Sequence, residues 1–253
     1  MSGAAWTRYV ALGDSLTEQI DADADCAVVP AIDSDPAGWA DRLATILAGH
    51  SRLGGRKIGF VNLAQPSASI AHTVERQIPA AIALDADLVS VVVGAGELLT
   101  ADADPASLAS GLADGVAVLR AAGAQVLLSN CFDPESAYLT KQARGKAALF
   151  TSYIWGIARE SGVSVLDLWG IREFHDASLW APDRSHLSAL GHRLLAARGA
   201  HALGVPYAET SARIGPAPGV PPAAQRSVDF DHVYFLRSAG LDRLRNDRTR
   251  PRS

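Results

Sequence analysis

Short, continuous apolar runs recur along the chain, and each is followed by a longer segment whose apolar residues have helical spacing. Runs without polar alternation are typical of strands that are buried on both faces, as in a parallel sheet covered by helices. The apolar runs cover residues 9–12, 58–62, 88–93, 125–129 and 163–166. This alternation predicts a three-layer α/β/α sandwich around a five-stranded parallel sheet, with a flavodoxin-like strand order.

The segments between the runs predict the helices that cover this sheet. They span residues 38–49, 70–84, 105–122 and 142–161, and a last helix begins near His186 and ends before Gly204. Pro79 falls inside the second segment, so we expect a turn or kink there.

The charge balance excludes some classes of partner. The 253 residues carry 27 acidic and 23 basic side chains, a net charge of −4. This balance does not indicate binding to nucleic acid or to an anionic membrane surface.

No apolar run is long enough to span a membrane, and residues 1–8 do not resemble a secretory signal, so we expect a cytoplasmic protein. Cys26 and Cys131 indicate neither a disulfide framework nor a metal site.

Two stretches depart from the alternating pattern. Residues 19–36 form a long acidic loop that lacks the turn glycine and the terminal Glu of a calcium loop, so we interpret it as a solvated lid. Residues 1–212 are predicted to form one domain. Residues 213–253 are predicted to hold a Pro-rich linker and a basic tail, in which residues 231–245 could form an amphipathic helix.

The first apolar run ends directly at Gly13-Asp14-Ser15-Leu16. Ligands of open α/β sheets bind at the carboxyl ends of the strands, so the position of Ser15 is that of a candidate nucleophile. The alternative is that Asp14 and Ser15 only cap the next helix.

A second motif, Asp183-Arg184-Ser185-His186, enters the last predicted helix after the last strand, at the same edge of the sheet. An Asp beside a His orients the imidazole and stabilises its charged form, and a Ser activated by that His can attack an acyl carbon. The alternative is that Asp183 caps the helix and His186 lies in its first turn.

Together the two motifs resemble those of the SGNH/GDSL hydrolase family, in particular its cytoplasmic actinobacterial members, which also carry a Pro-rich linker and a basic tail. The resemblance extends to Asn62-Leu63-Ala64, Gly94-Ala95-Gly96-Glu97-Leu98-Leu99, Asp167-Leu168-Trp169, His186-Leu187-Ser188 and Gly191-His192. It implies a flavodoxin-like fold and metal-free, cofactor-free hydrolysis or transfer of the acyl groups of small-molecule esters. It also implies that Ser15 is the nucleophile, His186 the general base and Asp183 the acid that orients it.

The chain departs from this family at the oxyanion hole. The family uses the amide of the nucleophilic Ser, a Gly after the second strand and an Asn after the third. The corresponding positions here hold Ser67 and Gly96. Ser67 keeps a backbone N–H, but Gly96 has no side-chain donor, and losing one donor typically lowers the rate by about 10²–10³-fold.

Three functional hypotheses follow. The protein is a slow esterase in which water, Ser67 or Asn130 replaces the missing donor, or an acyltransferase or hydrolase whose unusual substrate supplies the contact, or a binding protein on the same fold. A flavin or nucleotide binder is less favoured, because no strand is followed by Gly-x-Gly-x-x-Gly. We interpret His192 as a packing or surface residue and Glu97 as a group that orients the loop after the third strand, and Trp180 could line an acyl pocket.

Overall fold

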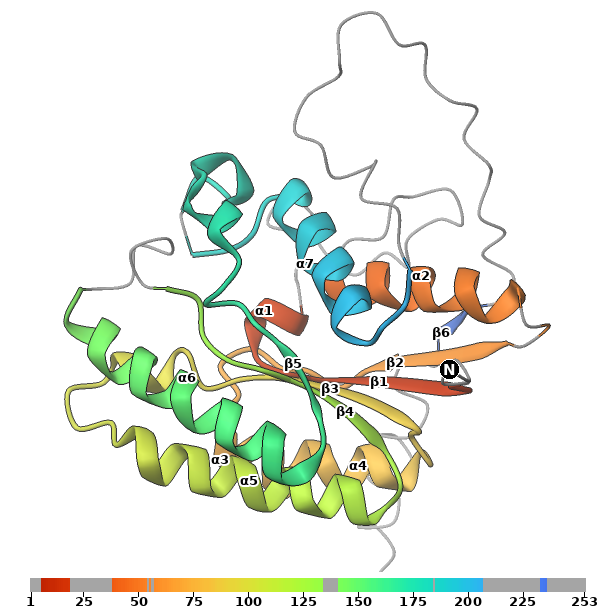
Figure 1. Ribbon diagram of the computed structural model, residues 1–253, viewed down its shortest axis with the longest axis horizontal. Helices are drawn as coiled ribbons and strands as arrows, with labels where there is room; N and C mark the ends of the chain where they lie inside the picture. The colour runs from red at the N-terminus through yellow and green to blue at the C-terminus, as the bar shows by residue number, and fades with distance from the viewer. Residues whose placement is uncertain are drawn as a thin grey trace, which may run out of the picture.

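A parallel sheet lies between two layers of helices in the computed structural model (Figure 1), which describes residues 6–18, 38–53, 55, 57–133, 141–183, 185–206 and 233–235. The strands run in the order β5-β4-β3-β1-β2-β6, and every neighbouring pair is parallel. They are β1 (Arg8–Gly13), β2 (Ile58–Asn62), β3 (Leu88–Val92), β4 (Gln125–Ser129), β5 (Ser164–Leu166) and β6 (Val233–Phe235). The order of the first five strands confirms the predicted flavodoxin-like sheet.

The sixth strand corrects the prediction for the tail. The sequence suggests that residues 231–245 could form an amphipathic helix, but Val233–Phe235 pairs in parallel with Ile58, Gly59 and Phe60 of β2. Val, Tyr and Phe favour strands, and β2 offers an edge with unpaired backbone groups. The rest of that segment, the predicted linker and the acidic loop of residues 19–36 lie outside the described residues.

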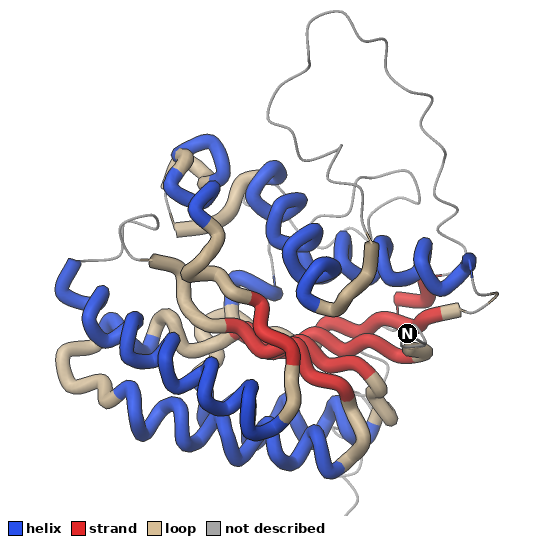
Figure 2. Tube along the Cα trace, in the orientation of Figure 1, coloured by secondary structure: helices blue, strands red, loops and turns tan. Residues whose placement is uncertain are grey.

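The helices cover the two faces of the sheet as separate layers (Figure 2). Helices α2 (Trp39–Leu53) and α7 (Ala189–Ala202) cover one face. The other face is covered by α3 (Ile70–His72), α4 (Ile78–Ala83), α5 (Pro105–Ala121) and α6 (Lys141–Ser161). Helix α7 begins at Ala189, three residues after His186, near which the sequence predicts the start of the last helix.

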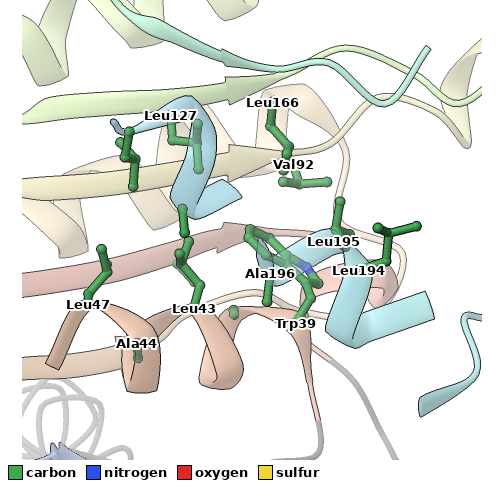
Figure 3. Packing of buried hydrophobic residues seen from close by; sticks show 14 of the residues in the cluster. Trp39, Leu43, Ala44, Leu47, Val92, Leu127, Leu166, Leu194, Leu195 and Ala196 are labelled. Carbon is green, nitrogen blue, oxygen red and sulfur yellow. The ribbon is translucent and has the colours of Figure 1, made fainter. Parts of the chain in front are cut away.

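Each face of the sheet contributes to its own apolar core. In β1, Tyr9 and Ala11 belong to the cluster under α2 and α7, whereas Val10 and Leu12 belong to the cluster on the opposite face. Figure 3 shows the first cluster, where side chains such as Leu43 of α2 and Leu195 of α7 pack with strand residues. Because both faces are dry, the strands need apolar residues at successive positions, and this is the pattern that the sequence shows.

The second helical segment is interrupted where Pro79 predicted a turn or kink. Between α3 and α4, residues Thr73–Gln77 form a π-helical turn in which the amide of Ile78 donates to the carbonyl of Thr73. Proline has no N–H, and its ring clashes with the carbonyl four residues earlier in a regular α-helix. A π turn directly before Pro79 avoids this conflict and changes which side chains of the segment face the sheet.

Helix α7 approaches the preceding turn very closely. A Cβ added at Gly191 would lie 2.2 Å from the carbonyl oxygen of Leu179. The amide of Ser188 donates to that same oxygen at 2.9 Å. Residue 191 therefore has to be glycine for α7 and this turn to stay in contact.

We expect Gly191→Ala to lower the free energy of unfolding by about 1–3 kcal/mol, because the new methyl group overlaps backbone that has no room to move. Gly49→Ala is the matched control. Gly49 is an exposed residue of α2 with open space around its Cα, so alanine should raise stability there by about 0.5–1 kcal/mol through helix propensity. Urea denaturation of both variants measures the two effects, and equal effects of the same sign would contradict the close contact.

Candidate active site

Ser15 lies at the turn that follows β1. The carbonyl of Asp14 accepts from the amides of Thr17 and Glu18, and its side chain accepts from the amide of Leu16 at 3.1 Å. Asp14 therefore caps the short helix α1 (Ser15–Glu18), as the capping alternative expected. The side chain of Ser15 is exposed, and its hydroxyl has no hydrogen-bond partner among the described residues. This hydroxyl remains available for chemistry.

The turn itself depends on Gly13. Its φ of +148° is one that residues with side chains rarely adopt, and an added Cβ would lie 2.1 Å from the carbonyl oxygen of Val92. The amide of Asp14 faces that same oxygen at 3.3 Å. The chain therefore leaves the sheet tightly packed over the end of β3.

Asp183 and His186 are brought together directly. The Oδ2 atom of Asp183 lies 2.5 Å from Nδ1 of His186. The Oδ1 atom of Asp183 accepts from the amides of Ser185 and His186 at 2.9 and 3.1 Å. The bond to His186, followed by the two backbone bonds, lowers the pKa of Asp183 to about 2. With Nδ1 held by the carboxylate, Nε2 is the ring nitrogen left to act on another group.

The loop that carries this pair is closed at its base. Trp180 and Leu187 form an antiparallel bridge, and the amide of Ala181 donates to the carbonyl of His186 at 2.8 Å. Leu16 packs against the apolar cluster that contains Trp180 and Leu187. The turn that carries Ser15 and the loop that carries His186 therefore both pack against this cluster, although no hydrogen bond joins Ser15 to His186 within the described residues.

Ser67, the first of the two positions predicted for the oxyanion hole, follows β2 in an exposed turn with a φ of +56°. This left-handed conformation is uncommon for residues other than Gly, Asn and Asp. The backbone at residue 67 thus has a shape that favours the glycine expected from the resemblance.

At Gly96, the second position predicted for the oxyanion hole, the backbone does not require glycine. Its φ and ψ of −64° and −38° suit any residue, and an added Cβ would meet no atom within 4 Å. By contrast, the φ of +104° at Gly94 does require glycine. The absence of a side chain at residue 96 is therefore not imposed by the backbone.

Glu97 has the orienting role that the sequence predicted. Its Oε2 atom accepts from the amide of Ile70 at 2.7 Å, at the N-terminus of α3. A carboxylate at this position satisfies a backbone donor that the helix itself cannot satisfy. Glu97 therefore ties the loop after β3 to the first turn of α3.

Asn130 and Trp180 are engaged elsewhere. Asn130 is buried, donates to Asp167 Oδ1 at 2.5 Å and accepts from the amide of Trp169 at 3.2 Å, so it holds the loop after β5. Trp180 donates to the carbonyl of Phe174 at 2.8 Å and packs edge-on against the rings of Phe132 and Phe174. Trp180 is a core residue, so these contacts do not support the acyl-pocket hypothesis.

Sequence reasoning missed one polar contact at the turn of residues 13–15, which is made by Gln77. The side-chain amide of Gln77 accepts from the Gly13 amide at 2.8 Å and donates to the Gly13 carbonyl at 2.9 Å. The only signal in the sequence is that Gln77 falls on the apolar face of its helix, in line with Ile70, Val74 and Ala81. A polar residue at a core position of a helix indicates a buried hydrogen-bond partner.

Two buried ionisable groups near the site have opposite pKa shifts. Burial raises the pKa of Asp14 to about 6, and the charge of Glu97 acts in the same direction. Burial lowers the pKa of His192 to about 4, and the positive charges of Arg42 and His186 add to this effect. His192 is a buried packing residue, in agreement with the sequence interpretation.

These shifts predict opposite dependences of stability on pH. Between pH 4 and 6, His192 is protonated only in the unfolded chain, so it makes the free energy of unfolding rise with pH. In the same window Asp14 is protonated only in the folded chain, so it makes that free energy fall with pH. Relative to wild type, His192→Gln should therefore lose stability as pH rises from 4 to 6, and Asp14→Asn should gain it, each by on the order of 2 kcal/mol.

Urea denaturation at pH 4, 5 and 6 measures both slopes against wild type, so contributions from all other groups cancel. Slopes that change in the same direction in the two variants would contradict these assignments.

No group of three or more His, Cys, Asp or Glu side chains in the described part of the chain could hold a metal ion. Cys131 is a free, buried thiol. No helix within the described ranges is both long and apolar enough to cross a membrane.

Comparisons with solved structures support the fold. The chain is similar to Axe2, an acetylxylan esterase from Geobacillus stearothermophilus, with 19% identity, a TM-score of 0.64 and coverage of 81% of this chain and 98% of that one. It is similar to LAE5, an alpha/beta hydrolase enzyme from the metagenome of Lake Arreo, Spain, with 21% identity, a TM-score of 0.64 and coverage of 79% and 96%. The psychrotrophic esterase EstA from Pseudoalteromonas sp. has 15% identity, a TM-score of 0.61 and coverage of 78% and 97%.

No curated protein matches the chain in sequence. The sequence model of the GDSL-like Lipase/Acylhydrolase family, however, matches residues 11–194. This range begins within β1, includes Ser15, Asp183 and His186, and ends within α7. The chain therefore belongs to the GDSL-like lipase/acylhydrolase family.

Proposed function

We propose that this protein hydrolyses carboxylic esters through an acyl-enzyme on Ser15, with His186 as general base and Asp183 as its orienting acid. Nε2 of His186 takes the hydroxyl proton while Oγ of Ser15 attacks the ester carbonyl carbon. The bond to the alcohol then breaks, and His186 returns the proton to the departing oxygen. Water, deprotonated by His186, then attacks the acyl carbon, the bond to Oγ of Ser15 breaks, and His186 returns the proton to Oγ as the acid is released.

The observation that carries this proposal is the Asp183–His186 pair. The carboxylate binds Nδ1 at 2.5 Å and is itself held by two backbone amides. This arrangement fixes the tautomer, with the proton on Nδ1, and leaves Nε2 as an acceptor. Such an imidazole serves as a base for an exposed hydroxyl. Ser15 presents one next to Leu16, which packs against the apolar cluster that contains Trp180 and Leu187.

The similar structures support a hydrolytic enzyme and a reactive serine. They include an acetylxylan esterase, of which a serine-to-alanine variant is a catalytic mutant, and an esterase inhibited by monoethylphosphonate. By analogy, small acyl esters are the substrate class to test first. Product analysis in the presence of added alcohols distinguishes hydrolysis from acyl transfer on the same triad.

We expect wild-type protein to react with a fluorophosphonate probe and to hydrolyse 4-nitrophenyl acetate, and Ser15→Ala to abolish both. Ser152→Ala is the matched control, since Ser152 is exposed on α6 and bonds only within its own helix. Mass spectrometry locates the adduct, and absorbance follows hydrolysis. A folded wild type that neither reacts at Ser15 nor releases nitrophenol would refute the proposal.

The oxyanion hole is proposed to be weakened by Gly96. The backbone amides of Ser15 and Ser67 then stabilise the oxyanion without a side-chain donor at residue 96. The open space at Gly96 and its ordinary helical φ and ψ mean that a side chain can be introduced without strain.

We expect Gly96→Asn to raise kcat/KM on 4-nitrophenyl acetate about tenfold or more, because a restored donor stabilises the developing negative charge. Gly96→Ala, which stiffens the backbone without adding a donor, is the control. Steady-state kinetics compare the two variants. If asparagine performs no better than alanine, the missing donor does not limit the rate.

A further inference from the structure

We propose that Gln77 is a positioning residue for the nucleophile, because its side-chain amide holds the peptide groups on both sides of Gly13 and so sets the direction in which Ser15 leaves the sheet. This inference rests on the proposed function of Ser15. Gln77 is far from Ser15 in the sequence. It lies between α3 and α4, on the face of the sheet opposite α7 (Figure 1).

The first support is the geometry of the contact. Oε1 of Gln77 accepts from the Gly13 amide at 2.8 Å, and Nε2 donates to the Gly13 carbonyl at 2.9 Å. The side chain of Gln77 is buried, with an exposed fraction of 3%. A paired contact of this kind resists rotation of both adjoining peptides, whereas a single hydrogen bond constrains only one of them.

The second support is the place of Gly13 in the sheet. On one side, β1 pairs with β3 up to Val92. On the other side, the pairing with β2 ends at Ala11 and Asn62, two residues earlier. The Gly13 carbonyl still receives the amide of Gln65 at 3.1 Å, but Gly13 has no strand acceptor for its amide there. Oε1 of Gln77 supplies this acceptor, so the side chain takes the place of a strand peptide.

The third support is the π-helical turn that ends at Gln77. The amide of Ile78 bonds back to Thr73, and Pro79 follows directly. A π turn adds a residue to the helical repeat and rotates the following side chains, and such turns are frequent at functional sites. The irregular turn therefore brings a polar side chain to the end of β1 within an otherwise apolar helix face.

Two substitutions test the role of the contact. Gln77→Met keeps the side-chain length but removes both hydrogen bonds. Gln77→Glu keeps the acceptor, and it keeps a donor only while the carboxyl is protonated. Gln125→Met is the matched control. Gln125 accepts a hydrogen bond from the Trp6 indole at 3.1 Å at the start of β4, at the other end of the strands.

We expect Gln77→Met to lower kcat and the rate of fluorophosphonate labelling of Ser15 by about 10- to 100-fold, with KM changed less than about threefold, because a small displacement of the attacking atom slows the chemical step. Gln125→Met should lower the unfolding midpoint without changing either rate. For Gln77→Glu, the labelling rate divided by that of wild type should be near one at low pH. This ratio should fall at least tenfold as pH rises and the carboxyl loses its donor.

All rates are measured on the full chain well below the unfolding midpoint. The inference would be overturned if a folded Gln77→Met variant had wild-type kcat and labelling rates. It would also be overturned if Gln125→Met lowered these rates as much as Gln77→Met does. If Gln77→Met does not fold, a pH-independent ratio for Gln77→Glu overturns it. An active wild type with unaffected Gln77 variants refutes only this inference, whereas a wild type that is inert at Ser15 refutes it together with the proposed function.

Discussion

The carbonyl oxygen of Val92 leaves no room for a side chain at residue 13, and the candidate site depends on this close approach. Because β1 and β3 remain paired up to this point, the chain can turn out of the sheet only through a glycine, and it does so with a φ of +148°. The next two residues are Asp14, which caps α1, and Ser15, which begins it. Ser15 is thereby exposed at the carboxyl edge of a sheet whose central strands are buried on both faces, so a rigid scaffold carries a solvent-accessible hydroxyl.

The second half of the site is held by different forces. The Asp183–His186 pair lies in a loop that is closed by the Trp180–Leu187 bridge and backed by α7, which packs against the turn at Leu179 without an intervening side chain. The pair itself is half-exposed, so solvent screens its charges, and its geometry depends on backbone amides that hold the Asp183 carboxylate. Leu16, next to Ser15, packs against the same extended apolar cluster that contains Trp180 and Leu187.

The two positions proposed for the oxyanion hole differ in how strongly the backbone favours glycine. Ser67 has a left-handed backbone conformation, which glycine would adopt more easily than serine. Gly96 has ordinary helical angles and open space around it, so the backbone there would accommodate a side chain.

The residues alone were enough to predict β1 to β5, the layer order and the Asp183–His186 pair. Strands that are buried on both faces need continuous apolar runs, so the bounds of β2 and β4 match the prediction. Asp183 and His186 are only three residues apart in one loop, and this spacing suffices to bring the carboxylate to the imidazole. Pro79 likewise predicted the irregular turn at Thr73–Gln77. Only the tertiary structure decided the contact of Gln77 with Gly13, the pairing of Val233–Phe235 with β2, the burial of Trp180 and the start of α7 at Ala189. The physical reason is that these features depend on hydrogen bonds and packing between segments far apart in the chain, and local periodicity carries no information about which distant partner a group will meet.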